Sequence, residues 1–106
     1  MLQKIQNSSI KNCNRNQLNV LCDELRSTIY QTVMECGGHL ASNLGAVEST
    51  VAIFYNFDFP NDKIVFDVGH QCYAYKLLSG RLDKFSSLLQ KDGISGFPKL
   101  NESIFD

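Results

Sequence analysis

The sequence is organised around the stretch Gly37-Gly38-His39-Leu40-Ala41-Ser42-Asn43-Leu44-Gly45. This stretch separates two helical patterns and contains one of the two histidines in the chain. The other histidine lies further along, in Asp67-Val68-Gly69-His70-Gln71. Glycine lets the backbone adopt positive φ and approach a ligand closely, and histidine exchanges a proton near neutral pH. The sequence therefore predicts that the two glycine-flanked histidine turns line two sides of one binding site.

Apolar residues at intervals of three and four predict two amphipathic helices, one on each side of this stretch. The first covers residues 17–35 and ends at the glycine pair, because glycine is common just after a helix C-terminus. The second reaches residue 56, with Ser42 or Asn43 as its N-cap. Its expected buried face consists of Leu44, Val47, Val51, Phe54 and Tyr55. We expect shorter helices over residues 71–78, closed by Gly80, and over residues 83–90.

One strand is predicted over residues 63–67, because the run Ile64-Val65-Phe66 is short, β-branched and aromatic without polar alternation. Such a strand is typical of a parallel sheet, and ligands bind at the carboxyl ends of strands in open α/β sheets. His70 follows that end. The expected class is therefore α/β, a parallel sheet with flanking helices, mostly helical in this part of the chain. A single strand makes no sheet, so its neighbours are expected in sequence beyond this chain or in a partner.

Length and charge narrow the class of protein further. The chain of 106 residues has the length of one small domain. We divide it into a polar arm, residues 1–16, and an incomplete domain, residues 17–106. The arm is expected to form a short helix or a loose segment. The net charge of −1 gives no basis for a nucleic-acid partner. We expect no membrane partner and a cytoplasmic location, because neither a membrane-span pattern nor a signal-peptide pattern is present. The apolar ending Ile104-Phe105-Asp106 predicts an interrupted chain.

The four cysteines do not show the spacing of a metal or disulfide framework; they are Cys13, Cys22, Cys36 and Cys72. Cys22 lies on the apolar face of the first helix, so we expect it to be a small core residue.

Each polar residue near the turns has a chemical and a structural interpretation. His39 and His70 either exchange protons or contact a ligand, or they hydrogen-bond the backbone within their turns. Ser42 and Asn43 either contact a ligand or cap a helix. Glu48 is either a catalytic carboxylate or a first-turn charge favoured by the helix dipole.

Three other features allow the same two interpretations. Asp67 either holds a cation or caps the next helix. Residues 93–96 could cradle a phosphate, but they lack the Lys-Ser/Thr of a P-loop, so a connecting loop is favoured. Tyr73, Tyr75 and Lys76 are expected at core and surface positions.

Three motifs in register resemble those of the 1-deoxy-D-xylulose-5-phosphate synthase family. The first is the histidine stretch continued to Glu48, and the second is Asp67-Val68-Gly69-His70-Gln71. The third is Lys91-Asp92-Gly93-Ile94-Ser95-Gly96-Phe97-Pro98-Lys99. The resemblance covers the chain from Gln17 onward. The chain differs from the usual family sequence at three places. It has Cys72-Tyr73-Ala74-Tyr75-Lys76 where the family has Ala-Tyr-Pro-His-Lys. It also has Phe54 where the family commonly has histidine, and Ser49 where the family has leucine.

The resemblance implies the first part of a transketolase-type thiamine diphosphate-binding domain. It implies a transferase that condenses pyruvate with glyceraldehyde 3-phosphate, with loss of CO₂, for isoprenoid and thiamine synthesis. The implied cofactors are thiamine diphosphate and Mg²⁺, and the implied assembly is a homodimer. By resemblance His70 contacts thiamine diphosphate, and His39 lines the substrate side as a catalytic residue.

The chain contains neither the Gly-His-Ser-Ser motif nor the Gly-Asp-Gly…Asn motif that holds the metal and diphosphate in the family. The metal ligands are therefore expected outside this chain, and we expect the chain alone to be inactive. The alternatives are a stand-alone binding or interaction module without catalysis, and the leading part of a split transketolase-type subunit.

Overall fold

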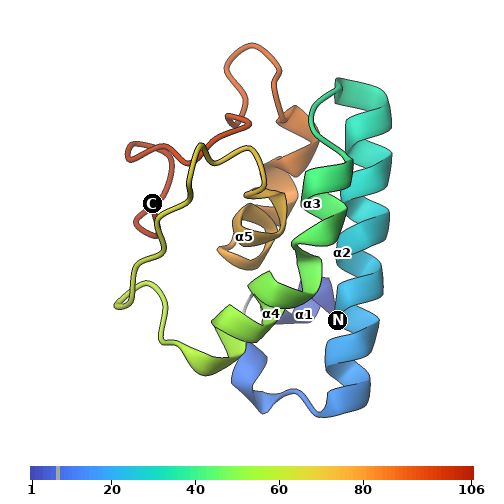
Figure 1. Ribbon diagram of the computed structural model, residues 1–106, viewed down its shortest axis with the longest axis vertical. Helices are drawn as coiled ribbons and strands as arrows, with labels where there is room; N and C mark the ends of the chain where they lie inside the picture. The colour runs from blue at the N-terminus through green and yellow to red at the C-terminus, as the bar shows by residue number, and fades with distance from the viewer. Residues whose placement is uncertain (7) are drawn as a thin grey trace.

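The longest helix, α2 (Arg15–Cys36), forms one side of the computed structural model, and the other helices pack against its inner face (Figure 1). The structure describes residues 1–6 and 8–106; Asn7, a part of the predicted arm, lies outside the described residues. The predicted helix over residues 17–35 is confirmed and begins two residues earlier. It begins there because Asn14 and Gln17 form a capping box, in which each backbone N–H donates to the other side chain, at 2.8 and 2.9 Å.

The single helix predicted after the glycine pair is wrong, since two helices occupy this region. They are α3 (Ala41–Gly45) and α4 (Val47–Asn56), and they meet at Ala46. The Ala46 N–H donates to the Asn43 carbonyl three residues back, at 3.2 Å, which tightens the chain at the low-propensity Gly45. Ser42 and Asn43 lie inside α3 and do not cap it.

The predicted buried face is correct at its centre and wrong at both ends, since Leu44 lies in α3 and is only partly buried. Val47, Val51 and Phe54 are buried, and Thr50 joins them. These residues lie at intervals of three and four, so they share one stripe of the helix. Tyr55 lies outside this stripe and is 38% exposed, contrary to the prediction.

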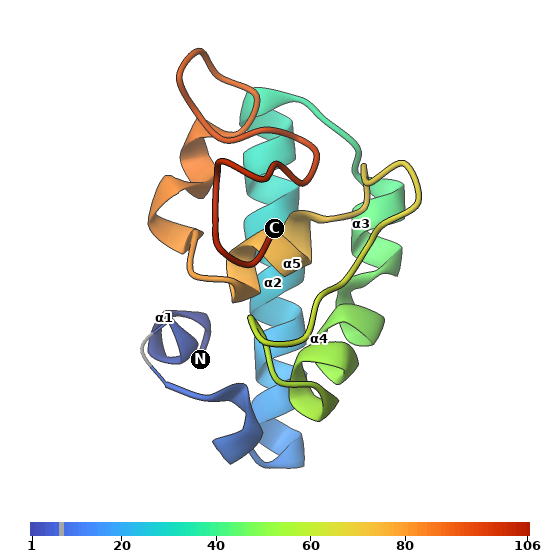
Figure 2. The same ribbon diagram turned by 90° about the vertical axis from the view of Figure 1, so that its left-hand side faces the viewer.

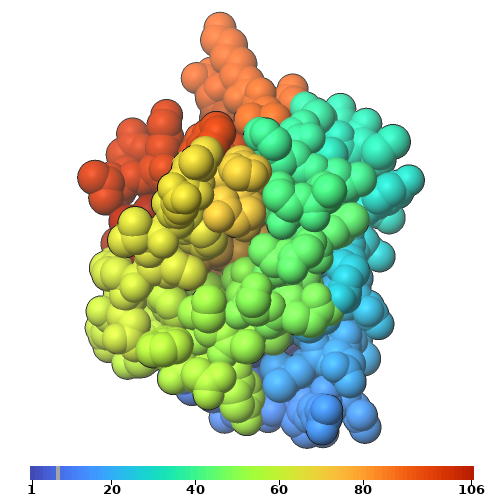
Figure 3. Space-filling view, viewed as in Figure 1, coloured from blue at the N-terminus to red at the C-terminus, as the bar shows by residue number. Residues whose placement is uncertain are grey.

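The predicted strand over residues 63–67 is wrong, and the described residues contain no strand. Residues 64–66 have no neighbouring extended segment to supply backbone hydrogen bonds, and a strand exists only within a ladder. The segment instead runs along the surface beside the C-terminal residues, where Lys63 Nζ donates to the Ile104 carbonyl at 2.6 Å (Figure 3). Val65 is 93% exposed, whereas the Phe66 ring packs edge-on against Tyr75. This part of the chain is therefore mostly helical.

Helix α5 (Tyr73–Leu78) lies between α2 and the C-terminal segment (Figure 2). It begins two residues after the predicted start, and Gly80, at φ +88°, follows its end. The helix predicted over residues 83–90 is a 3₁₀-helix, η2 (Leu82–Ser87). It stops early because the chain turns back, with the Leu89 N–H donating to the Ile94 carbonyl at 3.0 Å. Leu89 is consequently half exposed.

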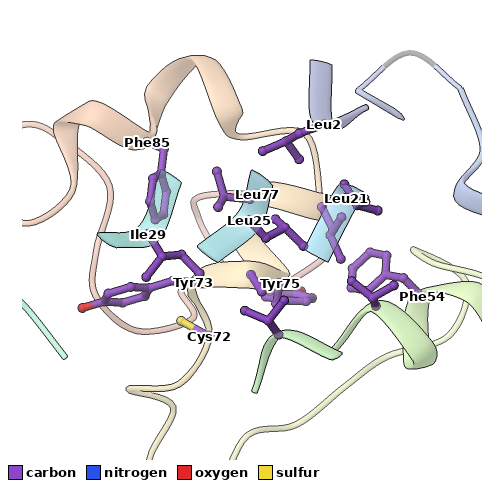
Figure 4. Packing of buried hydrophobic residues seen from close by; sticks show 14 of the residues in the cluster. Leu2, Leu21, Leu25, Ile29, Phe54, Cys72, Tyr73, Tyr75, Leu77 and Phe85 are labelled. Carbon is purple, nitrogen blue, oxygen red and sulfur yellow. The ribbon is translucent and has the colours of Figure 1, made fainter. Parts of the chain in front are cut away.

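The core lies where α2, α4, α5 and η2 converge (Figure 4). Helix α5 contributes the most completely buried side chains, and all six of its residues are buried. The N-terminal segments α1 (Leu2–Ile5) and η1 (Ile10–Asn12) also pack here, since Leu2, Ile5 and Ile10 are buried. No described helix has the length and apolarity that a membrane crossing requires.

Candidate functional site

The two histidine turns lie side by side. Their imidazole rings have centroids 4.9 Å apart, with ring planes inclined at 54°. His39 lies between α2 and α3 and is exposed, and His70 precedes α5 and is half buried. No hydrogen bond joins either imidazole to another described residue. Both rings are therefore free to contact a common ligand.

The turn around His39 depends on Gly38. Its φ is +121°, and a Cβ at this position would lie 2.6 Å from the Tyr73 hydroxyl oxygen. That hydroxyl accepts a hydrogen bond from the His39 backbone N–H at 3.3 Å. Tyr73 is fully buried, so it supplies a rigid base beneath the turn. The sequence predicts Tyr73 only at a core or surface position, and the structure adds its contact with the histidine turn.

The turn before His70 is tight and strained. The Gly69 N–H donates to the Asp67 carbonyl at 2.7 Å, which closes a three-residue turn with Val68 at its centre. Val68 has φ +63°, an unusual conformation for a β-branched residue. At Gly69, with φ +100°, a Cβ would lie 2.8 Å from Pro98 Cδ. His70 is thus presented by a turn, and the predicted strand end is absent.

A third loop, residues 93–98, closes the site. The Phe97 ring lies edge-on to His39 with centroids 6.5 Å apart, and Pro98 packs on the Gly69 turn. Gly93 is required because a Cβ there would lie 1.9 Å from the Ser87 carbonyl oxygen, so its role in packing is clear. Phe97 was not identified from the sequence as a site residue. The signal that could have identified it is its place in the third motif, which occurs in register with the two histidine motifs.

Of the remaining candidates, Glu48 has a structural partner, whereas Asp67 and Ser42 cap no helix. Glu48, in the first turn of α4, pairs with Arg26 of α2. The Asp67 side chain is exposed and does not cap α5. Ser42 is half buried and makes no cap.

Asn43 has a different position from either prediction, because it is fully buried between the two histidine turns. Its Nδ2 donates to the His39 carbonyl at 2.6 Å and to the His70 carbonyl at 2.8 Å. Its Oδ1 accepts from the Tyr73 N–H at 2.9 Å.

The cysteines are free thiols. Cys22 is buried on the inner face of α2, as predicted. Burial raises the pKa of the Cys72 thiol to about 11, so this thiol stays protonated at neutral pH and is a poor nucleophile. Its Sγ donates to the Gly96 carbonyl at 3.6 Å, which holds the third loop.

A buried network of charges ties the C-terminal segment to α5. Lys76 Nζ donates to Glu102 at 2.6 Å, and Arg81 donates to Glu102 at 2.8 Å and to Asp106 at 2.8 and 2.9 Å. Glu102 also accepts from the Ser95 N–H at 3.0 Å, at the start of the loop that carries Phe97. Lys76 was expected in the core or on the surface; it is a buried charge, and its carboxylate partners lie too far along the sequence for local patterns to reveal.

A separate cavity of about 380 Å³ lies at the other end of α4. Phe54, Phe57, Phe59 and Phe105 line it together with α1 and η1 residues. It shares no lining residue with the histidine turns.

Comparisons with known proteins identify the family. A sequence profile described as 1-deoxy-D-xylulose-5-phosphate synthase matches residues 2–106. The chain belongs to the 1-deoxy-D-xylulose-5-phosphate synthase family. A synthase of this name from Clostridium perfringens is 50% identical over 107 residues, which is 100% of this chain and 17% of the relative. The synthase from Burkholderia lata is 52% identical over 99 residues, which is 93% of this chain and 16% of the relative.

The chain spans about a sixth of the length of these curated synthases, and it matches their N-terminal region. The three motifs that resemble the synthase family all converge on the histidine pair. The described residues contain no cluster of three or more His, Cys, Asp or Glu side chains able to hold a metal ion.

Proposed function

We propose that this chain forms the leading part of a 1-deoxy-D-xylulose-5-phosphate synthase. The complete enzyme would condense pyruvate with glyceraldehyde 3-phosphate with loss of CO₂, at the start of isoprenoid synthesis by the non-mevalonate route and for thiamine synthesis. One observation carries the proposal: in a chain of this family, two motifs distant in sequence place His39 and His70 with ring centroids 4.9 Å apart. The chain alone is inactive in this proposal, because it spans about a sixth of its relatives.

The residues around His70 fit the organic part of thiamine diphosphate. Next to His70, the buried Gln71 Oε1 has no hydrogen-bond partner among the described residues. A buried acceptor without a partner is costly, so a donor group on a ligand would stabilise it. When bound, thiamine diphosphate would carry the carbanion chemistry of the reaction. His70 would contact the cofactor through its half-buried ring.

The described residues do not fit Mg²⁺, which takes oxygen ligands and is held by carboxylates. Asp67 is the acidic residue of the His70 turn, and Glu48, the acidic residue that ends the first motif, is paired with Arg26. The metal ligands would therefore come from residues outside this chain, as the absent Gly-Asp-Gly…Asn motif also predicts.

His39 would act on the substrate side. Its ring is exposed beside Phe97, and its backbone N–H is bonded to Tyr73, so the turn is fixed while the imidazole is free. An imidazole nitrogen held this way can give a proton to, or take one from, a substrate oxygen. Phe97 would exclude water from one face of the ring.

We also propose that this chain is the first part of a transketolase-type α/β domain that binds thiamine diphosphate. The match of the family profile to residues 2–106 supports this proposal. The complete enzyme would be a homodimer, and its location in the cytoplasm stays a prediction.

A chimera tests the proposal. This chain replaces the matching segment of the Clostridium perfringens synthase, and product formation from pyruvate and glyceraldehyde 3-phosphate is measured with thiamine diphosphate and Mg²⁺. We expect turnover by the chimera and none by the isolated chain. His39→Gln should lower kcat by about 10²–10⁴-fold, the usual contribution of general acid–base catalysis. Tyr30→Gln, an exposed change on the outer face of α2, is the matched control.

A folded chimera without turnover would favour the stand-alone binding module. Turnover by the isolated chain would contradict the proposal that further sequence is needed. Restored turnover when the chain and the remainder are mixed as separate polypeptides would show that a split subunit is workable.

A further inference from the structure

We infer that Asn43 is a positioning residue that holds His39 and His70 in one site. The inference rests on the proposed function only in taking the paired histidines as the site. Asn43 is fully buried, although asparagine is mostly an exposed residue type. A buried carboxamide that is fully bonded rigidifies the groups it joins.

The three hydrogen bonds of Asn43 join three separate pieces of the chain. Nδ2 reaches the carbonyls of His39 and His70, and Oδ1 reaches the N–H of Tyr73 at the start of α5. The pattern requires two donors and one acceptor on a short, planar group, which only a carboxamide offers. It also assigns the nitrogen and oxygen of the side chain without ambiguity, because the two carbonyls need donors and the N–H needs an acceptor.

All three hydrogen bonds of the Asn43 side chain join it to backbone atoms, so they restrain the backbone of the turns and leave the imidazole rings unbonded. Each carbonyl belongs to a histidine whose ring makes no hydrogen bond with another described residue. Asn43 therefore fixes the positions of the two imidazole rings and leaves their nitrogen atoms available to bind a ligand or exchange a proton. Without it, the His39 turn would keep its single bond to the Tyr73 hydroxyl, and the His70 turn would keep its packing on Pro98.

The test is the proton NOE between the two imidazole rings in the isotope-labelled 106-residue chain. The rings are assigned with His39→Gln and His70→Gln, since the chain has two histidines. We expect a ring-to-ring cross-peak in the wild-type chain and its loss in Asn43→Ala. Asn43→Asp keeps the acceptor for Tyr73 but removes both donors, so it should also lose the cross-peak.

Thr50→Val is the matched control. Thr50 is 4% exposed, and its hydroxyl donates within its own helix to the Ala46 carbonyl at 2.6 Å. Removing this hydroxyl also deletes a buried polar group, but it should leave the cross-peak between the rings intact.

An unchanged cross-peak in folded Asn43→Ala would overturn the inference, as would its equal loss in Thr50→Val. If the Asn43 variants do not fold, the inference is tested on the wild-type chain by the rate of hydrogen exchange of the Asn43 side-chain amide. Both Asn43 side-chain amide protons should then exchange slowly with solvent, and rapid exchange would overturn the inference. The readout needs no catalysis, so the chimera can fail while this inference stands, and the reverse is also possible.

Discussion

At the scale of single residues, the histidine turns are made possible by unusual backbone conformations. Gly38 and Gly69 have positive φ and lie against neighbouring atoms where no Cβ fits. Val68, with φ +63°, adopts a similar conformation without being glycine. Strain of about 1–3 kcal/mol is typical of such residues and is concentrated at functional sites.

Replacing Val68 with glycine should relieve this strain. The Val68 side chain is 72% exposed, so little packing is lost. We expect Val68→Gly to leave the free energy of unfolding unchanged or to raise it by about 1 kcal/mol. Val65→Gly is the control, because Val65 is also exposed but does not have positive φ. It should lower stability by about 0.5–1 kcal/mol.

Urea denaturation of both variants measures the difference. If Val68→Gly were destabilised as much as Val65→Gly, the turn would not be strained.

At the scale of elements, the buried charge network joins α5 to the C-terminal segment. Burial acts to raise the pKa of Glu102, but hydrogen bonds from Lys76 and the Ser95 N–H outweigh it, so that this pKa lies below its ordinary value. The pKa of Asp106 is also lowered, because its hydrogen bonds from Arg81 outweigh the effect of burial. Both carboxylates therefore bind protons less readily in the folded chain than in the unfolded chain.

Stability should fall in acid for this reason. The contribution of Glu102 and Asp106 is complete above the pKa values of the unfolded chain, about 4, and is lost as pH falls through the lower folded values. We expect urea midpoints to decrease below about pH 4, and Glu102→Gln to flatten this decrease.

At neutral pH, Glu102→Gln should cost about 3–5 kcal/mol, because it leaves the buried Lys76 charge without its carboxylate. Glu35→Gln, at an exposed position of α2, should change stability by less than about 0.5 kcal/mol. Equal effects of the two substitutions would show that the network contributes nothing specific.

At the scale of the whole molecule, the N-terminal residues pack on the same core as the rest. Leu2 and Ile5 are buried, and Glu24 of α2 accepts hydrogen bonds from the Leu2 N–H at 2.6 Å and the N-terminal amine at 3.1 Å. The division into residues 1–16 and 17–106 stays a prediction, which a truncation can decide.

A chain that begins at Asn14 keeps the capping box of α2 but loses three buried apolar side chains. We expect it to unfold or to lose more than about 3 kcal/mol, since one buried leucine truncated to alanine costs about 2–5 kcal/mol. Lys4→Ala, an exposed change in α1, should be neutral. A truncated chain as stable as the full one would establish residues 1–13 as an independent arm.

The sequence by itself determined the helices with a strong period and a clear stop, such as α2, because spacing, cap and glycine are local signals. It also located both histidine turns and the family. The tertiary structure alone decided that residues 64–66 are not a strand, since a strand needs a partner. It alone showed that Asn43 joins the turns and that Lys76 is buried with Glu102, because both depend on groups far apart in the sequence.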